Sequence, residues 1–201
     1  MKRIQKSRRQ QTKFIAVWII ANFIGGFLVG YLEDNGWQFM ATLFFSGAIV
    51  GSLQWIILRW VGLRDWFWPL ASAFGWIFGY YILALLQPLV SNIVNSLWSK
   101  FGLWEVFWLN LINQPILFSF MALTQASILS YHTQKRVHTF GVWLFSSLVG
   151  GAMNGAIGAS LCSAICQALP NRLIGIVNGT SWAVYGIVTG VALFQQLIIN
   201  N

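Results

Sequence analysis

The chain has 201 residues, of which 57% are hydrophobic and only 8% are charged, and its formal net charge is +8. A water-soluble domain normally carries about 25% charged residues, so this composition excludes a conventional soluble enzyme and a disordered chain. With 12 Trp and 16 Phe besides, the sequence indicates one compact helical domain within a lipid bilayer.

Six apolar segments are long enough to cross, as helices, a hydrocarbon layer about 30 Å thick. They cover roughly residues 14–32, 37–58, 66–86, 103–129, 140–162 and 174–199. Transmembrane strands would instead alternate between polar and apolar residues over about ten positions, whereas these segments are longer and apolar throughout. The sequence therefore predicts an all-α bundle of six transmembrane helices over residues 14–199, preceded by a basic tail over residues 1–13.

The positions of the basic residues predict the orientation of this bundle. Six of them precede the first segment, and the connections after the second and fourth segments contain four more: Arg59, Arg64, Lys135 and Arg136. The opposite side receives only Lys100 and Arg172. Since Lys and Arg in short loops remain on the cytoplasmic side, we expect both termini to be cytoplasmic. The basic tail is also expected to attract anionic lipid headgroups, so the net charge does not predict nucleic-acid binding.

The first, third and fifth segments share a sequence pattern. Each has a Trp, a small residue three positions later, a small or polar residue next, and a Gly seven positions after the Trp. The residues are Trp18, Ala21, Asn22 and Gly25; Trp68, Ala71, Ser72 and Gly75; and Trp143, Ser146, Ser147 and Gly150. This pattern predicts three helical hairpins, at about residues 14–58, 66–129 and 140–199, repeated in parallel around an axis along the membrane normal. The alternative is convergence, because unrelated membrane helices also need interfacial Trp and small residues.

Glycines at helical spacing predict where the helices touch. Small residues let two backbones approach closely, and in lipid this packing replaces the hydrophobic drive that is available in water. The glycines expected at these contacts are Gly25, Gly47, Gly51, Gly75, Gly150, Gly151, Gly186 and Gly190.

The stretch from Gly47 to Gly79 contains two linked motifs, G-x3-G-x2-Q-W-x2-L-R and W-x2-A-S-x2-G-W. Over these 33 residues the chain resembles uncharacterised multi-pass membrane proteins of bacteria, cyanobacteria especially. The fourth segment departs from the motif, since Ala126 rather than Trp follows Gln125. The resemblance implies a membrane bundle in a bacterial cytoplasmic or thylakoid-type membrane. It implies no catalytic residue, because those proteins have no agreed activity.

Three glutamines are the first candidate for a functional site. Gln54, Gln125 and Gln196 lie near the cytoplasmic ends of the second, fourth and sixth segments, where a repeat would place them at one level. Each amide offers two donors and two acceptor lone pairs. Such a group can bind a solute, hold a water-filled vestibule or simply hydrogen-bond neighbouring helices.

A proline in the fourth segment marks the second candidate. Pro115 removes a backbone donor and clashes with the preceding turn, so we expect a kink there. Interrupted helices line binding cavities in many transporters. Asn113 and Gln114, beside the kink, are the residues expected to contact a ligand, and a purely structural kink is the alternative.

Two further features lie outside the predicted spans or at their ends. Residues 88–101 have an apolar stripe that includes Leu89 and Trp98, which predicts a separate interfacial helix. Cys162 and Cys166 are four positions apart, without the C-x-x-C redox spacing, and we expect them to serve as small apolar packing residues.

Three classes of function are compatible with these features, and an enzyme is the least favoured. The spans contain no histidine, and the chain shows no zinc spacing, nucleophile–base pair or nucleotide-binding glycine motif, so no metal, cofactor or catalytic residue is predicted. We expect a structural or accessory subunit that packs with other membrane proteins or with itself. The alternative is a small-solute-binding or transport component with its site near the fourth segment. A core filled by Phe, Trp and Leu would favour the first, and a polar pocket beside Asn113 and Gln114 the second.

Overall fold

The structure, a computed structural model, describes residues 2–196, with the side chains of all but residues 2–8, 171 and 172. The helical elements are α1 (Lys2–Leu32), η1 (Glu33–Trp37), α2 (Gln38–Met40), η2 (Ala41–Phe45), α3 (Ser46–Trp60), α4 (Phe67–Phe101), α5 (Glu105–Tyr131), α6 (Arg136–Ile165), η3 (Cys166–Ala168) and α7 (Asn171–Phe194). No strand occurs within residues 2–196, so the fold is all-α. Residues 197–199 of the sixth predicted segment, and the side chains of Arg172 and of the basic tail up to residue 8, lie outside this description.

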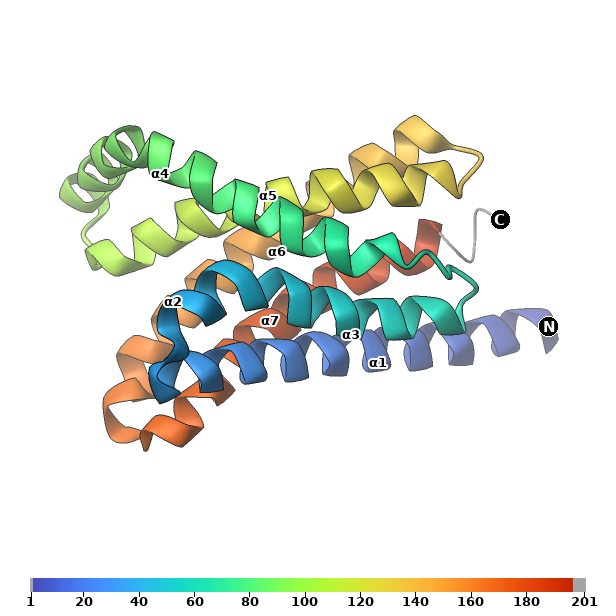
Figure 1. Cartoon of the computed structure of the whole chain (residues 1–201), viewed down its shortest axis with the longest axis horizontal. Helices are drawn as coiled ribbons and strands as arrows, with labels where there is room; N and C mark the ends of the chain where they lie inside the picture. Colours follow the sequence, from blue (N-terminus) through green and yellow to red (C-terminus); the bar gives the residue numbers. More distant parts are fainter. Residues whose placement is uncertain (1, 197–201) are drawn as a thin grey trace.

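Five helical runs in the described chain are long and apolar enough to cross a membrane. They are Arg9–Trp60, Phe67–Phe101, Glu105–Tyr131, Arg136–Ala168 and Leu173–Phe194. The sequence predicted six segments, and the first two of them fall within the first run. That run is broken at Asn35 (φ −101°, ψ 26°) and Gly36 (φ 90°), a positive φ that glycine adopts without steric cost. After the break, α3 returns alongside α1 (Figure 1).

The long helices form a closed ring. Each packs mainly against its neighbours in the order α1, α3, α4, α5, α6 and α7, and α7 packs against α1. Figure 1 shows the helices running lengthwise through the molecule. One end of this bundle, the basic end, carries the α3–α4 and α5–α6 connections, and the other, the acidic end, carries Glu33, Asp34 and Glu105.

The outer surface of the bundle is apolar, unlike that of a soluble protein, and some polar side chains lie inside. Gln54 and Gln125 are fully buried, whereas Trp60, Phe74 and Phe145 are 70%, 65% and 69% exposed. On a water-soluble protein, large apolar patches mark binding sites or cause aggregation. In hydrocarbon, apolar side chains are stable on the surface, whereas exposed polar groups without hydrogen bonds cost free energy. The arrangement therefore fits a membrane protein.

Aromatic rings fill the core of the ring of helices along most of its length. Towards the basic end, Trp143 packs edge-on against Trp18 and Trp68, with ring centroids 6.3 and 5.8 Å apart. Towards the acidic end, Phe118 contacts Trp182 and Tyr185 at 4.8 and 4.3 Å. Aromatic pairs at such distances are attractive beyond their buried area.

The eight glycines expected at helix contacts all face a neighbouring helix. A Cβ added at Gly47 would lie 2.5 Å from the Ser72 carbonyl oxygen, and one at Gly75 would lie 2.6 Å from that of Phe120. Added at Gly186 or Gly190, it would meet Asn22 or Trp18 of α1 at 3.1 or 2.9 Å. The same holds at Gly25, Gly51, Gly150 and Gly151, where the nearest atoms belong to Val50, Ser72, Tyr185 and Phe118.

Residues 88–101 continue α4 instead of forming a separate helix. The helix passes through Pro88 and ends at Phe101, and Figure 1 shows its last turns pointing away from the line of the earlier ones. Val90 and Val94 are buried against the core, whereas Leu89 and Trp98 are exposed. The segment is thus attached to the bundle by one face, while its other apolar side chains remain uncovered.

Candidate functional site

The glutamine predicted in α3 lies at the centre of a buried hydrogen-bond network. Gln54 Nε2 donates to Asn22 Oδ1 of α1 at 2.9 Å. Gln54 Oε1 accepts hydrogen bonds from Trp68 Nε1 of α4 and Gln125 Nε2 of α5, both at 3.2 Å. Gln125 Nε2 also donates to Ser72 Oγ at 2.7 Å. These bonds join four helices. Most of the hydrogen-bonding groups of the two glutamines therefore connect neighbouring helices of the ring.

Gln196 does not join this network. Its Oε1 accepts a hydrogen bond from Thr139 Oγ1 of α6 at 3.0 Å, and Thr139 accepts one from Thr133 at 3.1 Å. The expected group of three glutamines is therefore divided into a pair and a single residue. Two buried atoms near the pair, Gln125 Oε1 and Trp143 Nε1, have no hydrogen-bond partner in the described part of the chain.

The two polar residues beside Pro115, Asn113 and Gln114, lie in different surroundings. α5 runs without interruption from Glu105 to Tyr131, with Pro115 inside it. Gln114 borders a cavity on one side of the helix. Asn113 does not border it, and Asn113 Oδ1 is buried without a described partner.

This cavity, here called the polar cleft, lies at the acidic end and has a volume of about 610 Å³. Its walls come from four helices and their connections: residues 30–34, 104–114, 154–167 and 174–181. A volume of this size is within the usual range for small-molecule sites. Its polar lining residues include Glu33, Asp34, Asn110, Gln114, Asn154 and Asn178.

Close backbone contacts form the sides of the polar cleft. Gly155 of α6 lies directly against the Asn110 carbonyl oxygen of α5. A Cβ at Gly175 of α7 would lie 2.8 Å from the Phe27 carbonyl oxygen of α1. These contacts fix α5 to α6 and α7 to α1, and the cleft lies between the two pairs of helices.

Two atoms in the lining are buried without partners. Asn154 is 5% exposed, and its Nδ2 donor has no partner in the described part of the chain. Asp34 Oδ2 is likewise shielded from solvent and unpaired. A buried polar atom left without a hydrogen bond costs about 1–3 kcal/mol.

The two carboxyl groups belong to the connection between α1 and α3, outside the apolar segments 14–32 and 37–58. Glu33 Oε1 accepts a hydrogen bond from Thr42 Oγ1 at 2.6 Å. Burial raises the pKa of Glu33, the Thr42 hydrogen bond lowers it, and the charge of Asp34 raises it again. Burial also raises the pKa of Asp34. Both groups are thus less readily ionised than free carboxyl groups, and a cation beside them would favour ionisation.

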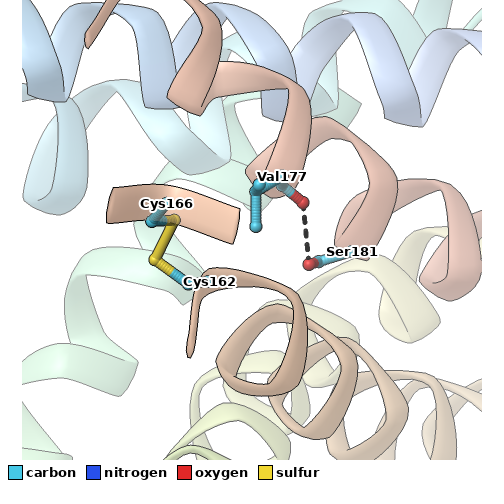
Figure 2. Close-up of a disulfide and its surroundings, with 4 residues drawn as sticks. All are labelled: Cys162, Cys166, Val177 and Ser181. Atoms are coloured by element: carbon cyan, nitrogen blue, oxygen red, sulfur yellow. Dashed lines mark hydrogen bonds between the residues drawn. A yellow bond between two sulfur atoms is a disulfide. The ribbon is translucent and has the colours of Figure 1, made fainter. Parts of the chain in front are cut away.

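The cysteines in the cleft wall form a disulfide, and the expectation that they act only as packing residues is wrong. Figure 2 shows the Cys162–Cys166 bridge joining the end of α6 to η3, with Val177 and Ser181 on α7 nearby. The helix loses α geometry at Ile165 (φ −131°, ψ −17°), and the two Cα atoms are 4.6 Å apart. Helical spacing alone did not reveal this change of backbone direction.

Sequence reasoning overlooked most polar residues of the cleft, including Glu33, Asp34 and Asn154. An adjacent acidic pair directly before Asn35 and Gly36 was an available signal, because ionisable residues near membrane depth usually face the bundle interior or a water-filled cavity. Asn154 lies in a glycine-rich stretch of α6, which by itself indicates helix packing. Its role depends on the neighbouring helices, which the local pattern does not specify.

Comparison of the chain with protein-family models, with curated proteins and with solved structures finds no match.

Proposed function

We propose that the chain crosses a bilayer six times, with the first helical run crossing twice. A straight helix of 52 residues would extend about 78 Å at 1.5 Å per residue, far more than a hydrocarbon layer about 30 Å thick. The break at Asn35 and Gly36 and the return of α3 beside α1 support two crossings. An even number of crossings leaves both termini on one side.

The basic end is proposed to face the cytoplasm of a bacterial cytoplasmic or thylakoid-type membrane. His132 of the α5–α6 connection pairs with Asp65 of the α3–α4 connection, with Nε2 and Oδ2 3.2 Å apart, so these two connections lie at the same end. They carry Arg59, Arg64, Lys135 and Arg136, as the positive-inside rule requires of a cytoplasmic face. The polar cleft then opens on the opposite side, and the basic tail meets anionic headgroups in the inner leaflet.

A threefold repeat of helical hairpins is proposed as the basis of the ring. Trp68 Nε1 donates to Gln54 of α3, in the preceding hairpin. Trp18 Nε1 donates to Thr189 Oγ1 of α7 at 3.1 Å, and α7 belongs to the hairpin that precedes the first around the ring. The third Trp, Trp143, has no such described bond. Two of the three Trp indoles therefore donate to the preceding hairpin, which supports the repeat.

The function that the geometry supports best is the binding of a small polar solute in the polar cleft. The observation that carries this proposal is the cavity of about 610 Å³, whose lining includes Glu33, Asp34, Gln114 and Asn154. No catalytic role is proposed, because the described residues contain no group of three or more metal-binding side chains and neither lining serine, Ser163 or Ser181, has a described hydrogen bond to a carboxylate. The protein is thus proposed to be a solute-binding membrane component and not an enzyme.

An accessory subunit remains a second candidate, and the filled core favours it. Trp18, Trp68 and Trp143 pack together in the core towards the basic end, so aromatic side chains occupy the interior there. Such a bundle is suited to packing with another membrane protein or with a second copy of itself.

Thermal unfolding of the purified protein in a neutral detergent tests the binding function. The probes are glycerol, glucose, glucosamine, ethanolamine, glycine and glucuronate, each added separately. A ligand at 100 times its Kd stabilises the folded state by about 2.7 kcal/mol. At least one probe is expected to raise the unfolding midpoint.

Two tryptophan substitutions show whether the effect comes from the polar cleft. Ser163 is exposed in the lining, so Ser163→Trp should fill the cleft without disturbing the core. Ser99→Trp is the control, since Ser99 is exposed on α4 away from the cleft. The proposal requires the shift to persist in Ser99→Trp and disappear in Ser163→Trp. If no probe stabilises the protein and another membrane protein copurifies with it stoichiometrically, the accessory function replaces the proposed solute-binding function.

A further inference from the structure

The Cys162–Cys166 bridge lies where the chain leaves α6, and it is accessible from outside the bundle. Cys162 is exposed and Cys166 is half-buried, and the three residues between them are exposed as well. Both cysteines border the polar cleft. Figure 2 shows the bridge at the end of α6, with Val177 and Ser181 of α7 nearby. A thiolate attacks a disulfide only at a sulfur that it can reach, and the exposure of Cys162 meets this condition.

Contacts that hold α6 in the bundle come before the bridge in the chain. Gly155 lies directly against the Asn110 carbonyl oxygen of α5, and a Cβ at Gly158 would lie 2.9 Å from Ser181 Oγ of α7. The bridge joins residues only four positions apart, and the stabilisation that a disulfide provides decreases as the loop it closes becomes shorter. We therefore expect the bundle to remain folded when the bridge opens.

The backbone between the two cysteines differs from that of a continuous helix. Ile165 leaves α geometry, with φ −131° and ψ −17°. The Cα atoms of Cys162 and Cys166 are 4.6 Å apart, whereas four positions along an α-helix span about 6 Å. The bridge thus holds the start of the α6–α7 connection in a fixed conformation. Since Cys166 and Gln167 both line the polar cleft, opening of the bridge would affect the wall of the cleft.

We infer that the Cys162–Cys166 bridge is a thiol–disulfide exchange site, which a dithiol reduces in the folded protein, and that its opening frees the α6–α7 connection. A thiolate of the dithiol attacks Cys162 Sγ, the sulfur–sulfur bond breaks, and Cys166 leaves as a thiolate that takes up a proton. The second thiol of the reductant loses its proton and attacks the reductant sulfur bound to Cys162. This step closes a disulfide in the reductant and releases Cys162, which takes up a proton. The dithiol has then lost two electrons and two protons, and the cysteine pair has gained them.

The rate at which dithiothreitol reduces the folded protein in dodecyl maltoside tests the exchange. Samples are quenched with iodoacetamide, and the added mass gives the number of open cysteines. The reference is an oxidised peptide of residues 160–169, which carries the same bridge without the surrounding helices. We expect the two rates to agree within about tenfold, because access limits the exchange and the bridge is already exposed. Reduction of the protein that is slower than this would show that the fold covers the bridge, and it would overturn the inference.

Single-cysteine variants locate the sulfur that is attacked. Cys166→Ser leaves the thiol of Cys162, and Cys162→Ser leaves that of Cys166. In the folded protein, Cys162 should react with dithiodipyridine at least about threefold faster than Cys166, because it is the more exposed of the two. Equal rates, or faster reaction at Cys166, would overturn the attack at Cys162.

Hydrogen exchange of the oxidised and reduced protein tests the effect on the connection. Residues 163–169 should exchange faster after reduction, because a cross-link restricts the chain that it closes, whereas residues 140–155 of α6 should be unchanged. The double variant Cys162→Ser/Cys166→Ser should remain folded and exchange like the reduced protein. Unchanged exchange in residues 163–169 would contradict the freeing of the connection. Faster exchange throughout α6, or failure of the double variant to fold, would make the bridge a support of the whole bundle and overturn its role as an exchange site. None of these outcomes depends on solute binding in the polar cleft.

Discussion

The glycine contacts between helices lead to a quantitative prediction at Gly75. A Cβ placed there would lie 2.5 Å from Thr124 Oγ1, 2.6 Å from the Phe120 carbonyl oxygen and 2.7 Å from Met121 Cα. Two of these three atoms belong to the backbone of α5 and cannot rotate away. Gly75→Ala must therefore push α4 and α5 apart, even though it adds a single methyl group.

The expected cost of this substitution follows from three contributions. Overpacking of a tight contact costs about 1–3 kcal/mol. Displacing Thr124 also weakens its 2.8 Å hydrogen bond to the Ala71 carbonyl oxygen, at about 0.5–1.5 kcal/mol. Replacing Gly by Ala within a helix stabilises the helix by about 0.8–1 kcal/mol, because Ala has the higher helix propensity. Gly141 of α6 has no atom within 4 Å of an added Cβ, so Gly141→Ala should show only the last, favourable contribution.

Unfolding of both variants in dodecyl maltoside, followed by circular dichroism, measures this difference. Since the gain in helix propensity is common to the two substitutions, the difference between them isolates the contact. We expect Gly75→Ala to be less stable than Gly141→Ala by about 2–4 kcal/mol. Equal stability of the two variants would refute the packing of α4 against α5 through Gly75.

Three further measurements examine the core and the cleft wall. Gln54→Leu should lower the free energy of unfolding by at least about 1 kcal/mol more than Gln196→Leu, because Gln54 has three side-chain partners and Gln196 one; equal effects would contradict the network. Trp68→Phe should cost about 0.5–1.5 kcal/mol more than Trp143→Phe, since only the Trp68 indole N–H has a described acceptor. The Cys162–Cys166 bridge predicts that iodoacetamide adds no mass to the intact protein and adds two groups after reduction, and alkylation without reductant would show that the bridge is absent.

The amino-acid sequence by itself determined the fold class and many helix-forming regions of this protein. Long runs without charged residues specify helices in lipid, because a helix satisfies its own backbone and its length must match the hydrocarbon layer. The small residues at helical spacing also indicated which faces would meet. Gly47 and Gly51 of α3, for example, lie against Ser72 of α4. These properties depend on local composition and spacing, which a single segment displays without its neighbours.

The tertiary structure alone decided which polar residues meet. It joined Gln54 to Gln125 but placed Gln196 beside Thr139, and it brought Gln114 but not Asn113 to the polar cleft. Asp34 and Asn154 are 120 positions apart in the chain, and they line one cavity because α1, α5, α6 and α7 end around it. The rotation of each helix about its axis and its contacts with its neighbours in the ring determine which polar side chains come into contact. Neither is encoded in the spacing within one segment.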